Sequence, residues 1–233
     1  MRDLAKLARE LDLQIVLTTH SPYVLAELPP EGRIYLMDGV AGKTVVTGVS
    51  PEFAMTRMDE EQHPECDVYV EDPRAATLVS EAVVRGERDI LSRLQLIPFG
   101  SAQVGISLGT MKSQNRFPRA SVVFLDGDQD AAQGCQILPG GDAPEIVVFG
   151  ALQGTQWQGI SPRIGRDVAE TIDALNAAMV PGEHHAWVAN AANRLALGSD
   201  NLWQALCAQW AMQAAVADID AIVEPIRQAM DPA

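Results

Sequence analysis

The alternation of apolar and polar positions divides the first half of the chain into short helical and extended segments. This pattern predicts a helix at residues 1–12, a strand at 14–18, a helix at 23–28, and strands at 33–37 and 43–48. The helix at 23–28 is ended by Pro29-Pro30, because proline cannot continue a helix. Asp38-Gly39 is a turn-type dipeptide between the last two strands, so the sequence predicts a β-hairpin there.

A second alternation of strands and helices begins after a polar, proline-containing stretch at residues 49–66. It predicts strands at 67–70, 94–98, 121–125 and 145–149, helices at 74–85 and 103–111, and a Gly- and Gln-rich loop at 150–160. Alternation of this kind is typical of an α/β fold with a parallel sheet covered by helices. From about residue 166 the chain is rich in Ala and Leu, which predicts three or four helices.

The same pattern suggests how the chain divides. We expect an N-terminal piece at residues 1–50, a linker at 51–66, an α/β domain at 67–160 and a helical segment at 161–233. No apolar run approaches the roughly 20 residues that a membrane-crossing helix needs. The charged, amphipathic N-terminus lacks the features of a secretory signal. We therefore expect a cytoplasmic protein without a membrane partner.

Composition adds two restrictions. The 233 residues are 47% hydrophobic, enough for a substantial core, and the three cysteines are widely spaced, which favours buried free thiols over a zinc site. A net charge of −14 argues against broad, nonspecific attraction to nucleic acid, because phosphate contacts require clustered Lys and Arg. Acidic residues concentrated at a metal site, or a basic surface supplied by a partner domain, would reconcile this charge with nucleic-acid binding.

Carboxylates gather where two predicted strands end. Glu71 and Asp72 follow the strand at 67–70, and Asp126 and Asp128 follow the strand at 121–125. Ligands of parallel α/β sheets bind beyond the carboxyl ends of the strands, so these two clusters are expected to face one crevice. Mutual repulsion there would be relieved by Mg²⁺, a hard cation that prefers oxygen ligands. Two such ions could serve phosphodiester hydrolysis.

The second cluster reads Asp126-Gly127-Asp128, and Asp130 extends it to an Asp-x-Asp-x-Asp pattern. In an extended backbone the first two carboxylates point the same way, and Gly127 allows a metal or phosphate to approach closely. A turn with solvated acids is the alternative interpretation, because Asp-Gly is a common turn dipeptide. The apolar strand before it and the Glu-ending strand upstream favour the metal site.

These motifs resemble known families. Tyr69-Val70-Glu71 followed by a helix, together with Leu125-Asp126-Gly127-Asp128, resembles the Toprim fold of primases, type II topoisomerases and related nucleases. The upstream IVLTTHSPYVL is similar to the switch-histidine region that closes ABC ATPase domains. This order resembles the OLD (overcoming lysogenisation defect) nucleases, which act in phage defence or DNA repair. The resemblance implies a DNA endonuclease using one or two Mg²⁺ or Mn²⁺ ions, with Glu71 catalytic or metal-ordering and Asp126 and Asp128 holding metal.

The chain departs from the Toprim pattern at several positions. Many Toprim sequences have Gly after the Glu and another acid one turn later, whereas Asp72 and Ala75 stand at those positions here. Asp72 either replaces that acid or leaves one metal site weaker. Glu145 is a further candidate for a second metal site, against the alternative of an ordinary surface Glu. Family members also use a basic residue near the scissile phosphate, for which Lys112 is our candidate, with Arg116 and Arg119 close by.

Histidines give two weaker candidates. By the ABC resemblance His20 would contact the γ-phosphate of ATP, but the chain has no GxxxxGK[ST] loop, so we expect no ATPase activity from it alone. ATP would act only through an ATPase portion absent from this chain. His184 and His185 are adjacent, and neighbouring side chains on an α-helix point about 100° apart. That geometry favours packing over joint metal binding.

Two other function classes stay open from the sequence. The chain could be a non-cleaving Toprim module that binds nucleic acid or a partner, or a phosphoryl-transfer enzyme with an Asp-x-Asp nucleophile. The Glu-ending first strand disfavours the latter, whose nucleophilic Asp normally ends that strand. DNA is the expected partner, and a homodimer, if one forms, would use the ATPase portion or the helical segment.

Overall fold

The computed structural model describes residues 2–19, 21–39, 42–55, 64–180 and 182–231. The chain divides into two compact units, residues 1–65 and residues 66–233, and each is described by itself. Among the described residues, no helix is long and apolar enough to cross a membrane.

The first unit contains short helices and one hairpin. Its elements are α1 (Arg2–Glu10), α2 (Pro22–Ala26), the 3₁₀ turn η1 (Pro30–Gly32), β1 (Ile34–Gly39), β2 (Gly42–Thr47) and α3 (Pro51–Met55). The predicted antiparallel hairpin is confirmed, but Asp38 and Gly39 pair with β2 as part of the strand, so the turn predicted there is wrong. The strand predicted at 14–18 is also wrong, because residues 13–19 lack regular secondary structure.

A four-stranded parallel sheet organises the second unit. Its strands are β3 (Cys66–Val70), β4 (Leu94–Pro98), β5 (Ala120–Leu125) and β6 (Gln136–Ile137), in the order β4-β3-β5-β6. Each neighbouring pair is parallel, as the strand–helix alternation predicted. β6 escaped prediction because two residues carry no periodicity.

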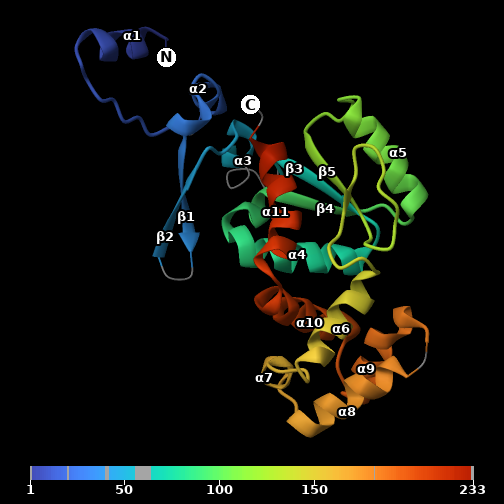
Figure 1. The fold of residues 1–233 in the computed structure, drawn as a ribbon. Helices are drawn as coiled ribbons and strands as arrows, with labels where there is room; N and C mark the ends of the chain where they lie inside the picture. Colours follow the sequence, from blue (N-terminus) through green and yellow to red (C-terminus); the bar gives the residue numbers. More distant parts are fainter. Residues whose placement is uncertain (1, 20, 40–41, 56–63, 181, 232–233) are drawn as a thin grey trace. The chain divides into compact units, whose positions relative to one another are not determined.

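Helices cover both faces of this sheet (Figure 1). Val68, Val122 and Phe124 belong to a buried cluster with residues of α4 (Pro73–Glu87) and α11 (Val216–Met230). Leu125 faces the opposite way, where a Cβ on Gly105 of α5 (Ala102–Ser113) would lie only 2.5 Å from its side chain. The unit is therefore a three-layer α/β structure.

The segment after the sheet differs from the prediction. Residues 145–149 belong to helix α6 (Pro144–Gly154) and are not a strand. A short apolar run has the same appearance in a buried strand and a buried helix. Pro144 at the first helical turn and Glu145 beside the positive helix N-terminus both favour the helix. The predicted loop at 150–160 is correspondingly shorter, because α6 continues to Gly154 and α7 (Ile160–Ile164) begins at its end.

The rest of the chain is helical, as predicted. It forms α8 (Val168–Met179), the 3₁₀ turn η3 (His184–Ala186), α9 (Trp187–Arg194), α10 (Ser199–Gln213) and α11, while a further 3₁₀ turn, η2 (Arg88–Arg93), precedes β4. α10 packs directly on α4, so these helices share the core of the second unit. Trp203 and Trp210 are buried in that core. None of the three cysteines forms a disulfide bond; Cys66 and Cys207 are buried and Cys135 is half-buried.

Candidate functional site

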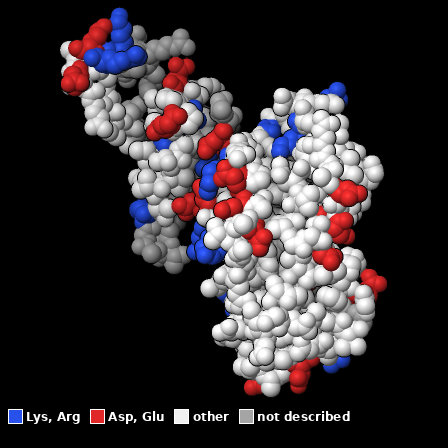
Figure 2. Space-filling model, in the orientation of Figure 1, with Lys and Arg blue, Asp and Glu red and all other residues white. Residues whose placement is uncertain are grey.

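The parallel register brings the ends of β3 and β5 together. Tyr69 of β3 lies opposite Val123 of β5, so Glu71 and Asp126 follow adjacent strands at the same edge of the sheet. Figure 2 shows acidic side chains along the edge of the second unit between α5 and α9. We call the four carboxylates that follow these two strand ends, Glu71, Asp72, Asp126 and Asp128, the acidic cluster.

Glu71 is held by the start of α5. The backbone N–H of Ala102 donates to Glu71 Oε1 over 3.1 Å, while Oε2 is buried and has no hydrogen-bond partner among the described residues. Burial raises the pKa of Glu71 above its usual value; hydrogen bonding from the backbone N–H groups of Ala102 and, more weakly, Asp126 opposes this, and the nearby charges of Asp128 and Asp72 add to it. One oxygen is fixed in place and the other remains an open acceptor.

Asp126 has the most strongly perturbed carboxyl in the cluster. Burial, followed by the negative charges of Glu71, Asp72, Asp128 and Glu145, raises its pKa to about 7. Its Oδ1 is buried without a hydrogen-bond partner among the described residues. Buried polar atoms are normally hydrogen-bonded, and like charges normally stay apart. Two open, buried oxygens at one sheet edge are the arrangement expected of a site that receives a cation.

The remaining acids of the two motifs differ in role. Asp72 is the N-cap of α4, where its Oδ1 accepts from the backbone N–H groups of Arg74 and Ala75. Asp128 is exposed and accepts from the side chain of Gln129, and Asp130 is exposed as well. Helix capping accounts for one Asp72 oxygen without any metal. Asp72, Asp128 and Asp130 therefore stay predicted ligands.

Gly127 is required by the protein backbone itself. A Cβ at this position would lie 2.6 Å from the carbonyl oxygen of Asp142, 2.8 Å from its nitrogen and 3.0 Å from the carbonyl oxygen of Leu138. The segment 138–142 therefore presses against the turn that carries Asp126 and Asp128. The sequence predicted that a metal or phosphate could approach Gly127 closely. In the structure, backbone atoms of Asp142 and Leu138 make such a close approach.

One predicted residue, Lys112, lies apart from the acidic cluster. Lys112 is in the last turn of α5, about 15 Å along the helix axis from Ala102, which contacts Glu71. The charge of Lys112 acts instead on the thiol of Cys135. Burial raises the pKa of that thiol above its usual value, and Lys112 opposes part of this shift. The structure thus does not bring Lys112 to the carboxylates. His20 lies outside the described residues.

Glu145 belongs to a second cluster, which we call the Glu–His cluster: Glu145, His184 and His185. Glu145 is only 2% exposed, and its Oε1 lies 2.7 Å from Arg74 Nη1 and 3.4 Å from His185 Nδ1. The three residues offer ligand atoms within 4.8 Å of one another, so they could hold a metal ion. The sequence did not reveal this grouping, because the folding of η3 back onto the start of α6 brings Glu145 to histidines about 40 residues later in the chain.

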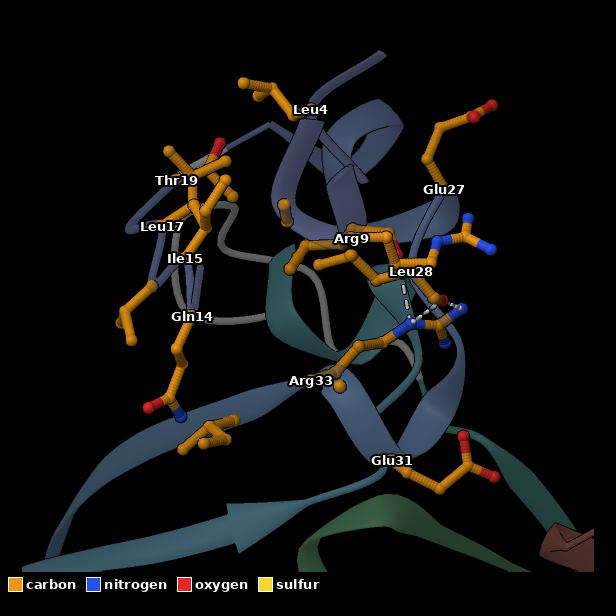
Figure 3. Close-up of a pocket in the computed structure, with 15 residues that line it drawn as sticks. Leu4, Arg9, Gln14, Ile15, Leu17, Thr19, Glu27, Leu28, Glu31 and Arg33 are labelled. Atoms are coloured by element: carbon orange, nitrogen blue, oxygen red, sulfur yellow. Dashed lines mark hydrogen bonds between the residues drawn. The ribbon is translucent and has the colours of Figure 1, made fainter. Parts of the chain in front are cut away.

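The first unit contains a pocket of about 730 Å³ between α1, residues 14–19 and α2. In Figure 3, Ile15, Leu17 and Thr19 lie on one side and Glu27 on the other. Arg33 stabilises the pocket floor by donating to the carbonyl oxygens of Leu25 and Leu28. Its described lining is mainly apolar and includes none of the predicted site residues, so the chemistry is sought in the second unit.

Comparison with protein-family models, curated proteins and solved structures found no match to this chain. The second unit is an α/β structure whose parallel sheet is flanked by helices, and a more specific family assignment rests on the sequence motifs alone.

Proposed function

We propose that the second unit carries a Toprim-like nuclease site that hydrolyses phosphodiester bonds of DNA with a divalent metal ion. Glu71, Asp126 and Asp128 are its metal-binding residues in this proposal. The observation that carries it is the pair of buried, unpartnered oxygens, Glu71 Oε2 and Asp126 Oδ1, on adjacent strand ends. The motif resemblance to Toprim nucleases supports the choice of DNA as substrate.

The donor set decides which cation fits. Glu71, Asp126 and Asp128 offer carboxylate oxygens, which suit Mg²⁺ or Mn²⁺ better than softer ions. Such an ion supplies Lewis-acid stabilisation of charge on the phosphate and lowers the pKa of a bound water. A bound cation would relieve the desolvation and the like-charge repulsion at Asp126, so the electrostatics of the site favour cation binding.

The protein's own residues prepare this site in two ways. The Ala102 N–H fixes Glu71 Oε1, which limits the rotation of the carboxylate and keeps Oε2 available. The raised pKa of Asp126 means that its carboxyl holds a proton below about pH 7, so loading the site requires release of that proton. Glu71 therefore offers an oriented ligand oxygen, and the proton on Asp126 makes metal binding dependent on pH.

A second candidate function is favoured by the position of Lys112. Nucleases that this chain resembles use a basic side chain near the scissile phosphate. Lys112, the candidate for that role, lies about 15 Å along α5 from Ala102, the residue that contacts Glu71. A Toprim-like module that binds nucleic acid or a partner without cleaving it needs no such group. The two functions share the metal site and differ in bond cleavage.

The test is nicking of supercoiled plasmid by the full chain with Mg²⁺, with Mn²⁺ or with EDTA. We expect metal-dependent nicking that Asp126→Asn abolishes. Asp173→Asn is the matched control, because it removes one charge from an exposed aspartate of α8. Metal-dependent DNA binding without nicking would support the non-cleaving module, and nicking that survives Asp126→Asn would overturn the proposed site.

A further inference from the structure

The Glu–His cluster brings together two segments that are remote in the sequence. Glu145 lies in the first turn of α6, while His184 and His185 belong to η3, about 40 residues later. Glu145 is buried, His184 is half-buried and His185 is exposed. The cluster thus has a buried anionic floor and an open side through which an ion could enter.

The spacing of the ligand atoms matches a small transition-metal ion. Metal bonds of about 2.0–2.1 Å in tetrahedral geometry place neighbouring ligand atoms about 3.3–3.4 Å apart. Glu145 Oε1 and His185 Nδ1 are already 3.4 Å apart, and all three ligand atoms fit within 4.8 Å. Only a small rotation of the side chains would be needed to close the set around one ion.

The imidazole rings are held together by packing. The ring centroids of His184 and His185 lie 3.9 Å apart, and the His184 ring meets the edge of Trp187 at 6.3 Å. Trp187 packs in turn on Phe149 of α6, the helix that begins at the Glu145 end. The histidines are consequently fixed against the same helix that supplies the carboxylate, which lowers the entropy cost of binding an ion.

The ion pair with Arg74 leaves part of Glu145 available. Arg74 and His185 both approach the same oxygen of Glu145, Oε1. A carboxylate can keep an arginine on one oxygen and ligate an ion with the other, or share one oxygen between them. Arg74 also orients the carboxylate, as the partners of metal ligands commonly do.

We propose that Glu145, His184 and His185 bind a divalent transition-metal ion of the zinc type, at a site separate from the acidic cluster. Two imidazoles and one carboxylate suit Zn²⁺ far better than Mg²⁺, which prefers oxygen ligands. Three protein ligands leave a fourth position for water or another ligand. The site joins η3 to the start of α6, and its existence does not depend on the proposed nuclease function.

The test uses the full chain, freed of metal by a chelator and then dialysed. Zn²⁺ affinity is measured by competition with a chromophoric chelator, and Co²⁺ is added separately to record its visible absorption. With excess Mg²⁺ present to occupy the acidic cluster, we expect one equivalent of Zn²⁺ to bind, and Co²⁺ to give the intense spectrum of a four-coordinate site. His185→Gln should weaken Zn²⁺ binding by at least ~100-fold, since outer partners alone contribute 10- to 100-fold.

His185→Gln is the preferred variant because the side chain is 64% exposed, so its replacement should leave the metal-free fold intact. His63→Gln is the matched control, because it makes the same substitution at a histidine that does not belong to the Glu–His cluster, and it should keep full affinity. Glu71→Gln should also keep Zn²⁺ affinity, which separates this site from the acidic cluster. Substoichiometric binding by the wild type, or equal affinity of His185→Gln and wild type, would overturn the proposal.

Discussion

Glu145 and Arg74, which are 71 positions apart in the sequence, form an ion pair of 2.7 Å whose carboxylate side is only 2% exposed. Arg74 also uses its backbone carbonyl oxygen to accept a hydrogen bond from the indole N–H of Trp203 on α10. The start of α4 is thereby joined to both α6 and α10. This pair links the helical segment to the sheet layer close to the acidic cluster.

Removing Arg74 should therefore destabilise the second unit. Arg74→Met leaves a buried carboxylate without its cation, and breaking a buried pair in this way costs about 3–5 kcal/mol. Because Arg74 is 25% exposed, water should reduce the loss to the lower end, about 3 kcal/mol. Urea denaturation followed by circular dichroism measures it. The double variant Arg74→Met/Glu145→Gln should recover most of the loss, whereas a loss below ~1 kcal/mol in the single variant would show that the pair contributes little.

The stability of the metal-free protein should fall as the pH rises from about 4 to about 7. The pKa of Asp126 is about 7 in the folded chain against a usual value of 3.8. In this window the folded state keeps a proton that the unfolded state has released, so raising the pH favours unfolding. The unfolding temperature in EDTA should thus be higher at pH 5.5 than at pH 8.0. Asp126→Asn should reduce this difference, and an unchanged difference would count against the raised pKa.

The sequence predicted the sheet better than its surroundings. The strands at 67–70, 94–98 and 121–125 were predicted within one residue at each end, because a buried strand after a polar segment has a distinct pattern. The run at 145–149 was predicted as a strand and is a helix, because its local hydrophobicity fits both. Pro144 and Glu145, which favour a helix start, were the signals that should have decided it.

The same contrast holds for the candidate site. That Glu71 and Asp126 lie at the same edge of the sheet was predicted from the rule that parallel strands present their carboxyl ends at one edge. That their strands β3 and β5 are direct neighbours was not predicted, because the sequence gives no strand order. The contact between Glu145 and His185 could not be predicted, because it depends on how η3 folds back on α6 across 40 residues. The distance of Lys112 from the carboxylates likewise depends on the direction of α5, which begins at Ala102 beside Glu71.

Mg²⁺ should stabilise the protein at pH 8.0, and Glu71→Gln should remove most of that effect. An ion that binds only the folded state raises the free energy of unfolding by RT ln(1 + [L]/Kd), which is about 2.7 kcal/mol at a concentration of 100 Kd. Replacing a ligand should weaken binding by at least ~100-fold, because even indirect partners of a metal ligand contribute 10- to 100-fold. The measurement is the unfolding temperature without Mg²⁺ and at Mg²⁺ concentrations that increase in 10-fold steps. Glu170→Gln, at an exposed glutamate of α8, is the charge-matched control and should respond to Mg²⁺ like the wild type.

Gly127→Ala should damage the acidic cluster without touching any carboxylate. The new Cβ would lie 2.6 Å and 2.8 Å from backbone atoms of Asp142, which cannot move as a flexible side chain could. Overpacking of this kind costs about 1–3 kcal/mol and would displace the turn carrying Asp126 and Asp128. Gly150→Ala is the matched control, because nothing lies within 4 Å of its Cβ and Ala is favoured over Gly inside helix α6 by about 1 kcal/mol. The midpoint of urea denaturation should therefore fall for Gly127→Ala and rise for Gly150→Ala. Stabilisation by Mg²⁺ should be lost only in Gly127→Ala. Equal stability of both variants would mean that the segment 138–142 does not press on the metal-binding turn.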